Sequence, residues 1–62
     1  MLSSKYIEMF DRVTTATTTD DLWIQTKISR WHHKKGTLST KEMSSLERAI
    51  EIRRNWLDAK GR

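Results

Sequence analysis

Residues 36–60 read GTLSTKEMSSLERAIEIRRNWLDAK, and this stretch decides the fold. Its STKE segment, from Ser39 to Glu42, is a capping box, in which each side chain binds the backbone N–H group of the other at the start of a helix. The residues that follow contain no proline and repeat apolar side chains every three or four positions, which is the period of an α-helix. We therefore predict a helix over residues 40–60, about 30 Å long, that stops at Gly61.

This third helix carries two neighbouring stripes. The first stripe is Met43, Leu46, Ile50, Arg53 and Leu57. The second stripe is Ser45, Ala49, Ile52, Trp56 and Ala59. A helix at the edge of a bundle needs only one apolar stripe. The simpler interpretation is that each stripe packs against one of the other helices. The alternative is that Ile52 and Trp56 stay exposed and bind another chain, because exposed apolar anchors of this kind mark interfaces.

Arg53 places a charge inside the first stripe. We expect its stem to cover apolar surface while the guanidinium reaches solvent at the edge of the bundle. The alternative is an ion pair with an acid on the first helix or on a partner chain.

Two shorter helices are predicted upstream, over residues 4–14 and 19–35. The first has Ser3 or Ser4 as its N-cap and ends where threonines dominate residues 14–19, because β-branched side chains lower helix propensity. Its expected inner stripe is Tyr6, Met9, Phe10 and Val13.

The second helix begins beside Thr18, which forms a variant of the capping box with Asp21. It ends before Gly36, a residue suited to the left-handed conformation that closes helices. Its expected inner face is Ile24, Ile28 and Trp31. Together the three segments predict an all-α fold, a small three-helix bundle in a single domain over residues 1–62.

Composition limits the class of protein. The chain has 62 residues, a net charge of +4 and no cysteine. A chain of this length can hardly enclose a substrate pocket, so we expect neither an enzyme nor a small-molecule substrate. Disulfides and zinc-thiolate sites need cysteine. The chain has no apolar run of membrane-spanning length and no secretory segment, so we expect a cytoplasmic protein without a membrane partner. Its core is small, so a homodimer or a bound partner would supplement its stability.

No acidic residue lies between Leu22 and Lys41. The basic side chains of this stretch can neutralise phosphates, because no acid offsets their charge. Exposed indoles of Trp23 and Trp31 could stack on bases. The alternative is a solvated helix end with Trp31 in the core. The candidate nucleic-acid-binding residues are Lys27, Arg30, His33, Lys34, Lys35 and Lys41.

His32 and His33 do not predict a metal site. Adjacent helical residues point about 100° apart, so they cannot chelate one ion as an i, i+4 pair does. No nucleophile stands beside either imidazole in the sequence, so we expect no catalytic residue, no metal and no cofactor.

The sequence TLSTKEMSSLERAIEIRRNWL, residues 37–57, is a capped helix with a small residue, an acid and an arginine in the order Ala49, Glu51 and Arg53. This stretch resembles the Hha/YmoA family of small helical nucleoid-associated regulators, and residues 6–10 look like the opening helix of that family. The resemblance implies modulation of transcription by docking on an H-NS-like silencer. It makes Glu51 the candidate docking acid and lets the basic residues add DNA contact.

Two functional hypotheses follow. The first is a small non-enzymatic regulator that binds nucleic acid or a nucleoprotein complex through the cationic patch and an apolar helix face. The second is a protein-binding inhibitor or adaptor, of the kind that mobile elements use, which docks on a host protein through Ile52 and Trp56. The candidate protein interface is Glu51, Ile52, Arg53 and Trp56.

Overall fold

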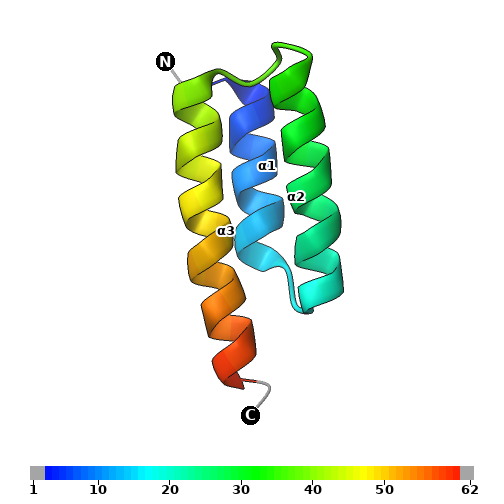
Figure 1. The fold of residues 1–62 in the computed structure, drawn as a ribbon, viewed down its shortest axis with the longest axis vertical. Coiled ribbons are helices and arrows are strands. Elements are labelled where there is room, and N and C mark those ends of the chain that lie inside the picture. The colour runs from blue at the N-terminus through cyan, green and yellow to red at the C-terminus, as the bar shows by residue number, and fades with distance from the viewer. Residues whose placement is uncertain (1–2, 61–62) are drawn as a thin grey trace.

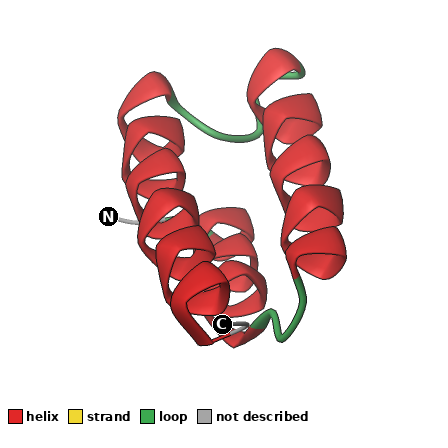
Figure 2. Ribbon diagram, turned by 60° about the horizontal axis from the view of Figure 1, so that its bottom comes forward, coloured by secondary structure: helices red, strands yellow, loops and turns green. Residues whose placement is uncertain are grey.

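The computed structural model describes residues 3–60 and shows three helices: α1 (Ser4–Thr15), α2 (Thr19–Lys34) and α3 (Thr40–Lys60). α1 and α3 run parallel, α2 runs antiparallel to both, and α3 extends beyond the end of α1 (Figure 1). Figure 2 shows that the described part of the chain is helix and loop, without strands. The predicted all-α three-helix bundle is confirmed, with each helix end within one residue of its expected position. Gly61, the predicted stop, lies outside the described residues.

The predicted N-caps of the first two helices form. The Ser3 hydroxyl accepts a hydrogen bond from the backbone N–H of Tyr6 at 3.1 Å. The Thr18 hydroxyl accepts one from the N–H of Asp21 at 3.0 Å. Each bond satisfies a backbone donor that has no partner within the helix, so each fixes where its helix begins.

Glu42 joins the start of α3 to the start of α1. Its Oε1 accepts from the backbone N–H of Ser39 at 3.0 Å, and its own N–H donates to the Ser39 hydroxyl at 3.1 Å, which completes the predicted capping box. Its Oε2 accepts from the backbone N–H of Ser3 at 3.1 Å and from the Ser3 hydroxyl at 2.8 Å. These donors, with the Ser39 N–H first among them, lower the pKa of Glu42 to about 2.

The turn from α2 into α3 depends on Gly36, whose φ is +85°. The Gly36 N–H donates to the His33 carbonyl at 3.1 Å, and the Thr37 N–H donates to the His32 carbonyl at 2.9 Å. This pair of bonds is the Schellman motif, which satisfies the last carbonyls of a helix. The turn then directs Leu38 into the core, where it is 1% exposed.

The core consists of two apolar clusters. The first cluster is Tyr6, Met9, Leu38, Met43 and Leu46, with Ile28 packed against it. The second cluster is Val13, Ala16, Leu22 and Leu57, with Ala49 and Ile50 packed against it. All three helices contribute to both clusters, so burial of these side chains holds the bundle together.

The predicted inner face of α2 is wrong at two of its three positions. Ile24 and Trp31 are 52% and 53% exposed, whereas the partly buried Ile28 packs against the first core cluster. The buried residues of the helix are Leu22, Thr26 and Ser29. Apolar spacing does not reveal this face, because two of its three buried residues are small and hydroxylated.

Thr26 and Ser29 can be buried because their hydroxyls are satisfied within α2. Thr26 Oγ1 donates to the Leu22 carbonyl at 2.8 Å, and Ser29 Oγ donates to the Gln25 carbonyl at 2.9 Å. A hydrogen-bonded hydroxyl avoids most of the cost of burying a polar group. Together with Leu22 they form the buried side of α2.

This inner face predicts opposite effects for two substitutions on α2. Ile24→Ser should change the free energy of unfolding by less than about 0.5 kcal/mol, because the side chain is exposed. Ser29→Leu should lower it by about 1 to 3 kcal/mol despite its greater hydrophobicity, because the site is fully buried and would have to accommodate three more carbons. Urea denaturation followed by circular dichroism measures both. A larger loss for Ile24→Ser than for Ser29→Leu would contradict this assignment of the buried face.

The Glu42 junction predicts a pH dependence. Because folding lowers the pKa of Glu42 from 4.5 to about 2, its stabilisation is complete above pH 4.5 and is lost as the pH falls towards 2. The wild-type free energy of unfolding should therefore fall more steeply over that range than that of Glu42→Gln. The control is Glu51→Gln, which removes one carboxylate at an exposed position of the same helix. Equal slopes for wild type and Glu42→Gln would show that the junction contributes nothing.

Candidate functional site

The outer face of α2 alternates indoles and ammonium groups. Trp23, Lys27, Trp31 and Lys35 follow one another at four-residue intervals, so they form a single row along the helix, and all four are exposed. The Lys27 Nζ lies 5.1 Å from the centroid of the Trp23 ring, and the Lys35 Nζ lies 4.5 Å from that of Trp31. Both distances are those of cation–π contacts. We call this row, together with its exposed neighbours Ile24, Arg30 and Lys34, the aromatic-cation face.

The positive charge of this face is not compensated nearby on α2. The acids of the helix are Asp20 and Asp21, and both stand in its first turn. Arg30 and Lys34 form no ion pair with any residue between 3 and 60. The charge of Lys27, Lys34 and Lys35 is therefore available to an anionic partner, whereas Arg30 also lines a depression with Glu47 and Glu51.

The indoles of this face are open to solvent. Trp23 is 54% exposed and Trp31 is 53% exposed, so the alternative that placed Trp31 in the core is wrong. The half-buried His32 meets the Trp31 ring edge to face, with the ring centroids 4.9 Å apart. This contact supports the indole from the side of the bundle and leaves part of the ring free.

The structure gathers only part of the predicted cationic patch. Lys27, Arg30 and Lys34 are exposed on α2, and Lys35 is exposed at its C-cap. His33 is half-buried, and its Nδ1 lies 3.2 Å from the carbonyl oxygen of Leu38, so it belongs to the interhelix turn rather than to the face. Lys41 is exposed in the first turn of α3, on a different element.

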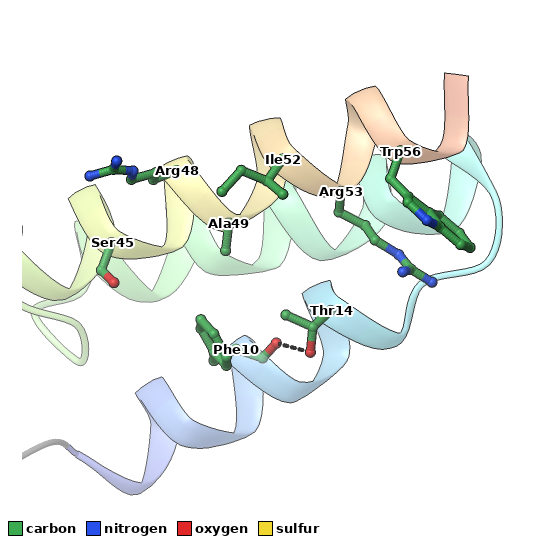
Figure 3. Close-up of a pocket in the computed structure, with 8 residues that line it drawn as sticks. All are labelled: Phe10, Thr14, Ser45, Arg48, Ala49, Ile52, Arg53 and Trp56. Atoms are coloured by element: carbon green, nitrogen blue, oxygen red, sulfur yellow. Dashed lines mark hydrogen bonds between the residues drawn. The ribbon is translucent and has the colours of Figure 1, made fainter. Parts of the chain in front are cut away.

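A second surface is a groove of about 420 Å³ between α1 and α3, which we call the α1–α3 groove (Figure 3). Phe10 and Thr14 line it from α1. The lining residues from α3 are Ser45, Arg48, Ala49, Ile52, Arg53 and Trp56. Ala49 points towards α1 across the groove (Figure 3), and its single methyl group leaves the space open.

Ile52 and Trp56 stay exposed, at 63% and 46%. α3 does pack against both other helices, but this part of its second stripe does not enter the core. The interpretation that both stripes are covered is therefore wrong. Ile52 and Trp56 have the exposure that the alternative requires.

Phe10 belongs to the groove rather than to the core. Its three partners in the predicted stripe are buried, whereas Phe10 remains exposed and its ring is tilted against Tyr6 with centroids 5.9 Å apart. The four-residue stripe spans a wider arc than α1 buries. Phe10 stands at one edge of that arc, and this position in the sequence could have predicted its exposure.

Arg53 fastens α3 to the end of α1. Its Nε donates to the carbonyl of Ala16 at 2.8 Å, and Ala16 is the C-cap of α1. Its guanidinium carbon lies 4.0 Å from the centroid of the Trp56 ring, while the Lys60 Nζ lies 4.7 Å from it. The half-buried Arg53 thus bonds through Nε to a backbone carbonyl rather than to an acid on α1. It satisfies a helix-end acceptor and positions the indole.

Glu51 does not join the other predicted interface residues. It is exposed on α3 but lines a separate depression between α2 and α3, together with Arg30 and Arg54. The predicted set is therefore divided, with Ile52, Arg53 and Trp56 in the α1–α3 groove and Glu51 outside it.

Within residues 3–60, no three His, Asp or Glu side chains are grouped so that they could hold a metal ion. None of the described helices combines the length and the apolar character needed to cross a membrane. No family model, curated protein or solved structure matches the chain.

The role of Arg53 predicts a loss of stability on substitution. Arg53→Met keeps the stem but removes the bond to Ala16 and the contact with Trp56, so the free energy of unfolding should fall by about 1 to 2 kcal/mol. Arg54→Met, at an exposed neighbouring position, should change it by less than about 0.5 kcal/mol. Chemical denaturation compares the two. Equal effects would mean that the Ala16 bond contributes nothing.

Proposed function

We propose that this protein binds nucleic acid through the aromatic-cation face of α2 and acts as a small non-enzymatic regulator of a nucleic acid or nucleoprotein complex. The row of Trp23, Lys27, Trp31 and Lys35 carries this proposal. A role in a nucleoprotein complex is also what the resemblance to the Hha/YmoA family implies.

The electrostatics of the face support binding to phosphates. The chain has a net charge of +4, and α2 has no acid beyond its first turn. Lysines that neutralise phosphates release condensed counterions, so affinity from such contacts is strong at low salt and weak at high salt. Lys27, Lys34 and Lys35 are exposed and suited to this role.

The exposed indoles favour a single-stranded target. Trp23 and Trp31 are eight residues apart, which places them about 12 Å apart along the helix axis. Bases in a single strand expose their faces and stack on aromatic side chains, whereas bases in a duplex are already stacked on each other. An ammonium group beside each indole could contact a phosphate next to the stacked base.

The test is fluorescence anisotropy with a labelled oligothymidylate and a labelled duplex of equal length. We expect binding to the single strand at low salt, with a slope of log K against log salt of about −2 to −3 if three or four cations are engaged. The double variant Trp23→Ala/Trp31→Ala should bind at least about tenfold more weakly, because each stacking contact contributes about 1 to 3 kcal/mol. Lys27→Gln/Lys35→Gln should lower the slope by about 1.4.

Trp56→Ala provides the matched control, because Trp56 is also an exposed tryptophan but lies in the α1–α3 groove. It should leave the affinity unchanged. Vesicles of phosphatidylserine and phosphatidylcholine form a second arm, since tryptophan and lysine also suit anionic lipid surfaces. The proposal fails if the oligonucleotide does not bind at low salt, if Trp56→Ala is as damaging as the α2 variant, or if only the vesicles bind.

A further inference from the structure

The α1–α3 groove offers apolar side chains that nothing in the bundle covers. Phe10, Ile52 and Trp56 line it, and Ile7 stands one helical turn from Phe10 on the same side of α1, at 58% exposure. Apolar residues gathered in this way mark interaction sites, with aromatic side chains as their usual anchors. We propose that the groove is a docking site for an amphipathic helix with acidic flanks, supplied by another protein.

The dimensions of the groove fit a helix. It runs along α3 from Ser45 to Trp56, a rise of about 16 Å, which equals about three turns. α1 and α3 run parallel along its two sides (Figure 3). A helix laid between them would place side chains into the space over Ala49 and form a four-helix arrangement.

The charges of the groove select the kind of helix. The charged residues that line it are Arg48 and Arg53, and the Lys60 ammonium lies over the Trp56 ring. No acidic residue lines it. Arg48 and Lys60 are separated by about 18 Å along α3, so carboxylates near the two ends of a docked helix could meet them.

The same charges argue against a second copy of this chain as the occupant. In a symmetric dimer the same patch faces itself, so the Arg48, Arg53 and Lys60 of each copy would be brought together. Each copy also carries a net charge of +4. A partner with acidic flanks removes this repulsion.

The test uses two labelled helical peptides of about 14 residues, each with leucines at three- and four-residue spacing. One carries glutamate on both flanks, and the other carries lysine in the same positions. In anisotropy titrations we expect the acidic peptide to bind with micromolar affinity and the basic peptide to bind at least about tenfold more weakly. Ile52→Glu should weaken the acidic peptide at least about tenfold, because it places a carboxylate in the apolar groove.

Ile24→Glu is the matched control, since it introduces the same charge at a comparably exposed isoleucine on α2. It should leave peptide binding unchanged, as should Lys27→Gln/Lys35→Gln. Circular dichroism confirms that each variant is folded. The inference is overturned if both peptides bind equally or not at all, or if the α2 variants abolish binding. It is also overturned if sedimentation shows a dimer that Ile52→Glu dissociates, because the occupant would then be a second copy. The result does not depend on nucleic-acid binding, which uses α2.

Discussion

The orientation of α2 in the bundle depends on the burial of small hydroxylated side chains on its inner face. The hydroxyls of Thr26 and Ser29 donate hydrogen bonds to carbonyls of the same helix, so both residues can be buried without a polar partner elsewhere. These residues and Leu22 occupy the core side and set the rotation of α2 about its axis, which turns Ile24 and both tryptophans outwards. The exposed Trp23 and Trp31 are a direct consequence of this rotation.

The bundle presents two surfaces with different chemistry. The aromatic-cation face belongs to α2 alone, whereas the α1–α3 groove is formed by the other two helices. In a bundle of three helices, the groove between two of them lies across from the outer face of the third, so the two surfaces are on different sides of the molecule. One molecule could therefore contact an anionic polymer and a protein helix together, and this arrangement accommodates both hypotheses that the sequence raised.

The sequence predicted the helices well because their boundaries are set locally. The cap at Ser39, the cap at Thr18 and the glycine at position 36 all act within a few residues of themselves. It predicted the buried face of α2 poorly, because apolar periodicity gives no weight to hydroxyls that are satisfied inside the helix. The sequence grouped Glu51 with Ile52 in one candidate interface. In the structure these two adjacent residues line different depressions. The Ser3–Glu42 and Arg53–Ala16 bonds join residues far apart in the chain, so no local sequence pattern predicts them.

The polar bonds between α1 and α3 have a consequence for what the groove between them can admit. At one end of the pair, the Glu42 carboxylate accepts a hydrogen bond from Ser3. Further along, the Tyr6 hydroxyl lies 2.7 Å from the Ser45 hydroxyl. At the other end, Arg53 donates to the carbonyl of Ala16. Because these bonds link α1 and α3 at both ends, they oppose movement of either helix across the small Ala49 between them. A groove held open in this way would admit the helix proposed above without a large rearrangement of α1 and α3.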